Sequence, residues 1–399
     1  MKALIVGNGV AGISTARELR LREDKLEICV LARESYDYYS RIRLPEVFGG
    51  GILAAELLAL YKPSWYAERN IDVFLAREAV HIDRGGHRLM LSSGEELGYD
   101  FLVLALGSDS VRPSVPGAFL PGVFTVREYD DAARVRASVQ AHPESAAVIG
   151  GGLLGIEAAR HLQLFGTARV TVLEVAPRLL PRRLDSGGAA LLEGKLADMG
   201  IAIVTDARLA AFEGRDRLEG LAFASGGRER VLEAGTAVVS MGVRPRLGLA
   251  KAAGLATGRG IVVDRFLRTS DPSIYAVGDC AEFGGSVLGI IPAALEQAPC
   301  CAAALLGDET MPYGGTIPSN TLKVAGIDLF SAGIVDYAEG EGFEELVFKP
   351  GEGGYERYLI KGGQLAGAIV IGSKQRSRLI QPMVGKPMTR PELEAVVSE

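Results

Sequence analysis

Cysteine, histidine and tryptophan are scarce in this chain of 399 residues. The four cysteines, Cys29, Cys280, Cys300 and Cys301, are too few for a disulfide scaffold, and none lies in a C-x-x-C pair. We therefore do not expect a zinc or iron–sulfur site bound by cysteines. The four histidines lie outside every motif described below and show no metal-ligand spacing, so we expect no metal site.

An excess of positive charge and an uninterrupted long apolar run are also missing. The 43 basic residues are outnumbered by 49 acidic ones, and the formal net charge of −6 gives no electrostatic support for binding nucleic acid. The most apolar long stretch, residues 287–306, contains two prolines, a glutamate and a glutamine, which favours a buried loop and helix over a membrane span. No signal peptide is visible. We therefore expect a cytoplasmic protein that binds neither nucleic acid nor membrane.

Glycine, in contrast, is abundant, with 51 residues, and six of these form two motifs. The first motif follows an apolar strand pattern at residues 2–6 and has the form G-x-G-x-x-G, with Gly7, Gly9 and Gly12. A helical pattern and a second strand pattern follow, and then Glu34. Gly7 permits a tight turn, Gly9 lets a pyrophosphate approach the backbone, and Gly12 lets helix and strand pack closely, while Glu34 can accept hydrogen bonds from ribose hydroxyls.

The same motif recurs 143 residues later with Gly150, Gly152 and Gly155. It again lies between an apolar strand pattern and a helical pattern, and the next strand pattern ends in Glu174. Two mononucleotide-binding units in one chain predict two bound dinucleotides.

The second acidic residue bears on the choice of coenzyme. A carboxylate at Glu174 can bind a ribose 2′-hydroxyl but repels a 2′-phosphate, which favours NADH over NADPH. Arg178 and Arg182 follow in the sequence. They either weaken this preference or are solvated surface charges, and the sequence leaves both interpretations open.

Together with four further segments, these motifs carry a family resemblance. The segments are residues 39–45 (YSRIRLP), 105–108 (ALGS), 113–117 and the long motif 269–282 (TSDPSIYAVGDCAE). Over essentially its whole length the chain resembles the FAD- and NAD-linked reductases of the glutathione-reductase type. Within them it is most similar to NADH:rubredoxin reductases and to the flavin-binding part of the large subunit of NADH-dependent nitrite reductases.

The order of strand and helix patterns, read with this resemblance, predicts an α/β fold with two nested, doubly wound dinucleotide-binding domains. The FAD-binding domain is expected from two pieces, residues 1–112 and 245–310, with the NAD-binding domain inserted at residues 113–244. Alternating strand patterns after Gly307 predict a small C-terminal α+β domain at residues 312–399.

The resemblance also implies which residues bind FAD. Asp279 is expected at the start of a helix, where it would accept hydrogen bonds from the ribityl chain, and Glu296 and Gln297 at a helix N-terminus beneath the carbonyl edge of the flavin. Arg41 is implied near the flavin and pyrophosphate, with a surface helix arginine as the alternative, and Glu296-Gln297 can equally be a polar helix start. The full FAD set is Gly7, Gly9, Gly12, Glu34, Arg41, Val80, Ala105, Gly107, Asp279, Glu296 and Gln297.

For the second dinucleotide, the resemblance implies a smaller set of residues. Glu157, two residues after Gly155, would orient the nicotinamide so that its C4 points at flavin N5; the alternative is a carboxylate that stabilises the helix dipole. The full NAD set is Gly150, Gly152, Gly155, Glu157, Glu174 and Gly242.

Differences between this sequence and related reductases argue against disulfide chemistry. Coenzyme A-disulfide reductases and related NADH oxidases place a redox cysteine where this chain has Ile42, and no C-x-x-x-x-C dithiol is present. Pro45 and Glu46 occupy the region where several relatives carry a lysine near the flavin. Cys280 is best explained as a small buried hydrophobic residue. We therefore expect no redox-active disulfide.

The resulting interpretation is an NADH-dependent flavoprotein reductase that passes hydride from NADH to FAD and electrons on to a small redox protein such as rubredoxin. The alternatives are an NADH oxidase that reduces oxygen, a redox-sensing flavoprotein, and a subunit of a larger reductase. The sequence does not identify the acceptor, the direction of electron flow or the oligomeric state.

Basic residues are concentrated near the C-terminus. Residues 357–391 contain seven of them and no acidic residue, whereas residues 336–356 are rich in acids. Two interpretations are open: the charges pair between neighbouring strands, or the basic residues form a docking face for an acidic electron carrier.

Overall fold

The computed structural model describes residues 1–317, 319–351 and 353–398, with residues 319–324 described by their backbone alone. Contacts between Cα atoms divide the chain into two units. Unit 1 comprises Met1–Arg41, Leu53–Asp109 and Val243–Thr316. Unit 2 comprises Ile42–Ile52, Ser110–Gly242 and the chain from Ile317 on.

Unit 1 is built on a parallel sheet of five strands in the order β19-β7-β1-β2-β3. The strands are β1 (Lys2–Val6), β2 (Glu27–Leu31), β3 (Ile71–Phe74), β7 (Phe101–Leu104) and β19 (Ile274–Ala276). The sequences KALIV of β1 and FLVL of β7 are almost entirely apolar because both faces of these central strands are covered. The strand order reverses at β1, so its carboxyl end is a topological switch point, where open α/β sheets bind ligands.

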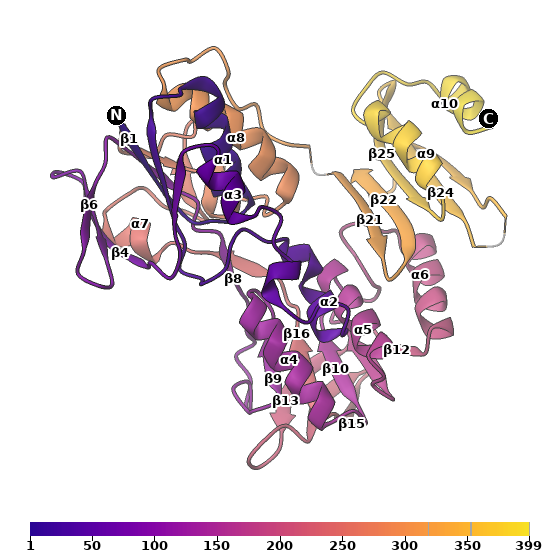
Figure 1. The fold of residues 1–399 in the computed structure, drawn as a ribbon. Coiled ribbons are helices and arrows are strands. Elements are labelled where there is room, and N and C mark those ends of the chain that lie inside the picture. Colours follow the sequence, from indigo (N-terminus) through magenta and orange to yellow (C-terminus); the bar gives the residue numbers. More distant parts are fainter. Residues whose placement is uncertain (318, 352, 399) are drawn as a thin grey trace. The chain divides into compact units, whose positions relative to one another are not determined.

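Helices α1 (Val10–Arg22) and α8 (Ile291–Leu305) pack side by side on this sheet (Figure 1). The segment IPAALEQAPCCAAAL of α8 is rich in alanine, which allows close helix packing. Among the described residues no helix is long and apolar enough to cross a membrane. Further elements of unit 1 are α3 (Pro63–Ala67), α7 (Gly248–Ala252), the antiparallel sheet of β4 (Ala79–Asp83), β5 (Arg88–Leu91) and β6 (Glu96–Gly98), and the pair β18 (Ile261–Val263) and β20 (Ala281–Phe283).

Unit 2 repeats the parallel sheet, in the order β12-β11-β10-β16-β9. The strands are β9 (Val123–Thr125), β10 (Ala146–Ile149), β11 (Val170–Leu173), β12 (Ile201–Val204) and β16 (Thr236–Val239). The helices are α2 (Leu44–Phe48), α4 (Tyr129–Ala141), α5 (Leu153–Leu164) and α6 (Ser186–Asp198). An antiparallel sheet of β13 (Arg208–Glu213), β14 (Gly220–Ser225) and β15 (Arg228–Glu233) completes this part. Strand β10 lies between β11 and β16, so its carboxyl end is again a switch point.

The C-terminal part of unit 2 is a five-stranded antiparallel sheet with two helices (Figure 1). In sheet order the strands are β21 (Ser319–Val324), β22 (Ile327–Gly333), β25 (Gln364–Ile371), β24 (Tyr355–Lys361) and β23 (Glu344–Phe348). The helices α9 (Lys374–Ile380) and α10 (Arg390–Ser398) cover a core that includes Phe330, Tyr358, Ile380 and Leu393. The predicted fold class, two doubly wound units with a small α+β part, is confirmed, whereas the exact domain boundaries stay a prediction.

Four of the seven basic residues at residues 357–391 pair with acids. The pairs are Arg357 with Glu345, Lys361 with Glu341 at 4.0 Å, Arg376 with Glu356 at 3.3 Å and Arg390 with Glu394 at 2.8 Å. Charge pairing within the C-terminal part therefore involves four of the seven basic residues, and the docking face stays a prediction.

Candidate cofactor-binding sites

The turn between β1 and α1 depends on close backbone approaches. Gly7 has a φ of +120°, and its N–H donates a 2.8 Å hydrogen bond to the Leu31 carbonyl. A Cβ atom on Gly7 would lie 2.1 Å from the Ala105 carbonyl oxygen, and one on Gly12 would lie 1.9 Å from the Gly7 carbonyl oxygen. Gly9, the N-cap of α1, has no described atom within 4 Å of where its Cβ would be. The open space beside Gly9 meets the unpaired N–H groups of α1, as a pyrophosphate requires.

The turn between β10 and α5 reproduces this geometry. Gly150 has a φ of +114°, and its N–H donates a 2.8 Å hydrogen bond to the Leu173 carbonyl. A Cβ atom on Gly150 would lie 2.3 Å from the Ser240 carbonyl oxygen, and one on Gly155 would lie 2.0 Å from the Gly150 carbonyl oxygen. Gly152 is the N-cap of α5 and is as open as Gly9. Each unit therefore presents the same turn geometry at its own switch point.

Distant segments of unit 1 converge on the first turn. A Cβ atom on Gly278 would lie 2.7 Å from Cβ of Ala11, at the start of α1. The Gly278 N–H donates a 2.7 Å hydrogen bond to Oε1 of the buried Gln297, and the Ser108 hydroxyl donates one of 2.8 Å to Oδ2 of Asp279. The structure thus brings together the glycine turn, the end of β7, Asp279 and α8.

The helices at two expected positions in this region differ from the prediction. Asp279 lies at the start of a helix, but this helix is a single 3-10 turn, Gly278–Cys280, that leads into β20. Helix α8 begins at Ile291, where Pro292 occupies the first turn that proline favours. Glu296 and Gln297 consequently lie in the second turn of α8. The exposed Glu296 carboxylate accepts a 2.6 Å hydrogen bond from the Thr316 hydroxyl.

Glu34 is held by neighbours that follow it in the sequence. Arg41 forms an ion pair with its Oε1 at 2.5 Å, and the Tyr39 hydroxyl donates a hydrogen bond to its Oε2. The Arg41 guanidinium also lies 5.4 Å from the centre of the Tyr39 ring. The structure therefore places Arg41 on the carboxylate that we expect to bind ribose.

The remaining predicted FAD residues lie at backbone irregularities. Val80 lies at a β-bulge of β4, where the pairing with β5 shifts register, and its side chain is 46% exposed. Gly107 has a φ of +69°, and its carbonyl accepts a 3.0 Å hydrogen bond from the Arg246 N–H.

Glu174 is fixed at the end of β11 by two backbone donors. Its side chain accepts hydrogen bonds from the N–H of Gly151 at 2.5 Å and from the N–H of Ala176 at 2.8 Å, and the residue is only 8% exposed. The acid therefore lies directly against the glycine turn. Gly242 has a φ of +93° and open space at its Cβ position, and its carbonyl accepts a hydrogen bond from Val111.

Glu157 is engaged by the C-terminal part of unit 2. Its Oε1 accepts a 2.8 Å hydrogen bond from the N–H of Ala325, at the tip of the hairpin between β21 and β22. Its Oε2 lies 3.7 Å from Nδ1 of His161, one turn further along α5. Burial raises the pKa of Glu157, and the Ala325 N–H opposes this by stabilising the carboxylate.

Sequence reasoning missed both partners of this carboxylate. The spacing of four residues between Glu157 and His161 on one helix is a signal that could have revealed His161. Nothing local could have revealed Ala325, which is 168 residues away.

The described cysteines lack the features of reactive thiols. All four are free; Cys29, Cys280 and Cys301 are buried, and Cys300 is partly buried. The Cys280 thiol donates to the Leu104 carbonyl at 3.2 Å. Burial raises the pKa of Cys29 and of Cys280 to about 11, far from the range of reactive thiolates.

These raised pKa values predict a loss of stability in alkali. Since the unfolded thiols ionise near pH 9 and the folded ones near pH 11, the folded state binds more protons between these values. The stabilisation that both thiols provide below pH 9 is lost as the pH rises towards 11. We expect the melting temperature to fall over this interval, and to fall less in the Cys280→Ala variant. Equal falls in both proteins, measured by calorimetry at pH 8 and pH 10.5, would contradict the assignment.

Comparison with known proteins identifies the class. The family model described as pyridine nucleotide-disulphide oxidoreductase matches residues 1–299, and the rubredoxin NAD+ reductase C-terminal domain matches residues 318–387. The chain belongs to the pyridine nucleotide-disulphide oxidoreductase family. The predicted resemblance to FAD- and NADH-linked reductases is thereby confirmed, and so is the assignment of FAD and NADH as the cofactors of the family.

Individual relatives show which members of this family the chain is similar to. The chain is 34% identical to a nitrite reductase [NAD(P)H] of Bacillus subtilis over 96% of its own length and 47% of the relative. It is 35% identical to a rubredoxin-NAD(+) reductase of Pseudomonas putida over 78% of this chain and 81% of that protein. The crystal structure of a ferredoxin reductase from Rhodopseudomonas palustris superposes with a TM-score of 0.86 at 30% identity, covering 97% of this chain and 96% of that one. This chain thus spans about half the length of the nitrite reductase it matches.

Proposed function

We propose that this protein is an NADH-dependent flavoprotein reductase that passes electrons to a small redox protein. The observation that carries the proposal is the pair of glycine turns with one geometry, each at a switch point and each followed by an acid after the second strand. We assign FAD to residues 1–112 and 245–310, NADH to residues 113–244, and a C-terminal domain to residues 312–399.

The first turn fits the adenosine diphosphate half of FAD. The opening beside Gly9 accommodates a pyrophosphate, whereas Gly7 and Gly12 leave no room for any side chain. Glu34, oriented by Arg41, would accept hydrogen bonds from the ribose, and Asp279, oriented by the Ser108 hydroxyl, would meet the ribityl chain. When bound, FAD supplies a ring that accepts a hydride and releases electrons singly.

The second turn fits NADH in the same way. Gly152 opens onto the pyrophosphate position, and Glu174 would bind the 2′-hydroxyl of the adenosine ribose. Glu157 would orient the nicotinamide, and the Ala325 N–H limits the rotation of its carboxylate. Preorganised orientation of this kind is a main source of rate in hydride transfer.

The electron acceptor is proposed as a small electron-carrier protein such as rubredoxin. Its support is the name of the Pseudomonas putida relative and the family of the C-terminal part. Activity as part of a nitrite-reducing protein is a different proposal, because this chain spans only 47% of that relative. A cytoplasmic location stays a prediction of the sequence.

An anaerobic titration tests the proposal. The purified protein is expected to be yellow and to lose its flavin absorbance when NADH is added without oxygen. Oxidised rubredoxin, ferredoxin, nitrite or air is then added to separate samples, and rubredoxin is expected to restore the absorbance fastest. Protein that cannot be reconstituted with FAD, or bound FAD that NADH does not reduce, would refute the proposal. Fastest recovery with air would identify an oxidase.

Replacing Glu157 tests the assigned orienting role. Glutamine keeps the size of the side chain and can still accept the Ala325 hydrogen bond, but it removes the charge. We expect stopped-flow flavin reduction by NADH to slow about tenfold with little change in the dissociation constant of NADH, since misorientation lowers the rate more than binding. The Glu229→Gln variant, which removes an exposed acid on β15 of unit 2, serves as the control. An unchanged rate with a lower melting temperature would show that Glu157 only anchors the hairpin.

A further inference from the structure

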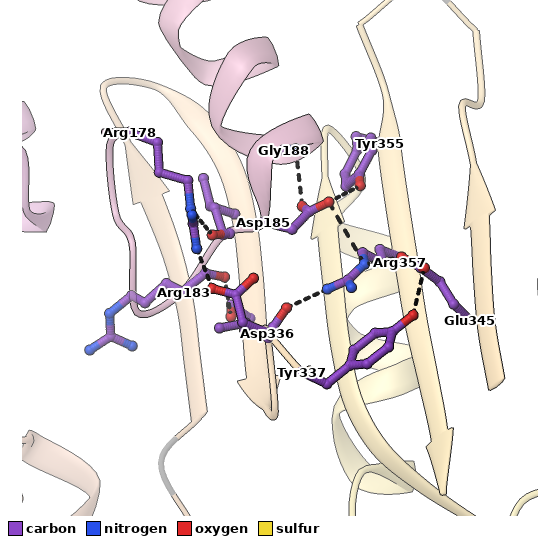
Figure 2. A network of polar contacts seen from close by, with 12 residues as sticks. Arg178, Arg183, Asp185, Gly188, Asp336, Tyr337, Glu345, Tyr355 and Arg357 are labelled. Carbon is purple, nitrogen blue, oxygen red and sulfur yellow. Dashed lines mark hydrogen bonds and ion pairs between the residues drawn. The ribbon is translucent and has the colours of Figure 1, made fainter. Parts of the chain in front are cut away.

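Arg178 is held in place by the loop that contains it and by the C-terminal part of unit 2, with its side chain 22% exposed. It lies four residues after Glu174, in the loop that leaves β11. Its Nε donates a 3.0 Å hydrogen bond to the Leu184 carbonyl, and its Nη2 donates one of 3.3 Å to the Pro181 carbonyl. The same Nη2 forms an ion pair with Asp336, which follows β22 (Figure 2).

The loop that carries Asp336 is itself fixed on both sides. Arg357 donates a hydrogen bond to the carbonyl of Val335, and its guanidinium lies 5.7 Å from the centre of the Tyr337 ring. The Tyr337 hydroxyl donates a 2.9 Å hydrogen bond to Glu345 (Figure 2). Asp336 is therefore presented to Arg178 by an ordered loop, although its carboxylate is 56% exposed.

The chemistry of this position concerns the 2′ substituent of the coenzyme. Sites that accept NADP place an arginine near the 2′-phosphate, whereas sites that accept NAD place an acid on the 2′-hydroxyl. This chain has both groups in one loop: Glu174 fixed by two N–H donors and Arg178 four residues further on. Which coenzyme is preferred then depends on whether Arg178 is free to turn towards the ribose.

We propose that Asp336 is a specificity-determining residue: by pairing with Arg178 it withdraws the cation that would bind a 2′-phosphate, so that the C-terminal part enforces the preference for NADH. The inference rests on the proposed NAD site. It assigns to Asp336 a role in a site to which the residue contributes no coenzyme contact of its own.

The test measures binding of the adenosine half alone. Dissociation constants of adenosine 2′,5′-bisphosphate and of 5′-AMP are determined by calorimetry for the holoenzyme and its Asp336→Ala variant. Since an exposed ion pair is typically worth up to about a factor of five in an equilibrium constant, we expect the bisphosphate to bind about fivefold more tightly to the variant. Binding of 5′-AMP should not change, and the ratio of kcat/KM for NADPH over NADH should rise by a similar factor.

Two further variants separate this mechanism from a general charge effect. Glu339→Ala removes one negative charge from the same loop without touching Arg178, and it should leave bisphosphate binding unchanged. In an Arg178→Gln background, Asp336→Ala should have no effect, because the cation it would release is gone. Arg182→Ala should not remove the gain if Arg178 is the cation responsible.

Three results would overturn the inference: bisphosphate binding unaffected by Asp336→Ala, a gain that persists without Arg178, or an equal gain from Glu339→Ala. Each of these can occur while NADH still reduces the flavin, so the proposed function would stand. Failure of 5′-AMP and NADH to bind the folded wild-type protein would instead refute the proposed NAD site itself.

Discussion

Replacing Gly12 with alanine is expected to lower the stability of the apoprotein and to abolish retention of FAD. The new Cβ would lie 1.9 Å from the carbonyl oxygen of Gly7, so α1 and β1 would have to move apart. Both partners of this clash are backbone, and no rotamer change relieves it. Overpacking of this kind costs about 3 kcal/mol when the backbone must shift.

The same substitution at Gly9 provides a matched comparison. Gly9 has φ −94° and ψ −174°, which alanine adopts without strain, and no described atom lies within 4 Å of the added Cβ. Apoprotein stability should therefore fall by only the small cost of alanine at an N-cap, about 1 kcal/mol or less. The methyl group nevertheless projects into the space assigned to the pyrophosphate, so FAD should bind more weakly.

Flavin absorbance per protein and thermal unfolding of the apoprotein distinguish the two variants. Gly12→Ala should fail in both measurements, and Gly9→Ala mainly in the first. If Gly12→Ala retained a full complement of FAD, the close helix–strand approach would not be required for binding. If Gly9→Ala retained it with unchanged affinity, the pyrophosphate would lie elsewhere.

The glycine turns could be predicted because their geometry is determined locally. A residue with positive φ and a point of backbone contact both require glycine, so the spacing in the sequence records the shape of the turn. The strands at the C-terminus were predictable for a similar reason. Their alternation of apolar and polar residues predicts strands at residues 343–349, 355–360 and 364–371, and the bounds of β23, β24 and β25 differ from these by at most one residue.

The sequence predicts less well where helices begin and which side chains pair with one another. The start of α8 is set by Pro292 and by packing on α1, not by the polar pair at Glu296 and Gln297. The place of Arg41 near the flavin and pyrophosphate stays a prediction, and its pairing with Glu34, seven residues away, was not predicted. A long flexible cation can reach several carboxylates, and only the folded chain decides which one it meets.

The contacts between the C-terminal part and the rest of unit 2 could not be predicted from the sequence. Ala325 with Glu157 and Asp336 with Arg178 join residues more than a hundred positions apart. No periodicity or spacing encodes such pairs. They nevertheless connect the C-terminal part to the two carboxylates that we assign to the coenzyme, Glu157 directly and Glu174 through its neighbour Arg178.

Replacing Arg357 with methionine is expected to destabilise this connection strongly. The side chain is only 7% exposed, and it pairs with Glu345 and lies 3.7 Å from Asp185, the N-cap of α6 (Figure 2). Methionine retains most of the apolar stem but leaves the largely buried Asp185 carboxylate without its cation. Breaking a buried pair from one side typically costs 3–5 kcal/mol, and because Glu345 is partly solvated we expect about 3 kcal/mol.

The matched control is Arg390→Met, which breaks the pair with Glu394 on the surface of α10. That pair has a spacing of four residues and an arginine side chain that is 55% exposed, so its loss should cost about 0.5 kcal/mol or less. Because a chain with several domains need not unfold in one step, amide hydrogen exchange of β23, β24 and the start of α6 is the appropriate measurement. Exchange there should accelerate about a hundredfold in Arg357→Met and hardly at all in Arg390→Met. Equal protection in both variants would mean that Asp185 is stabilised well enough by the Tyr355 hydroxyl and the Gly188 N–H, and that the buried cation contributes little.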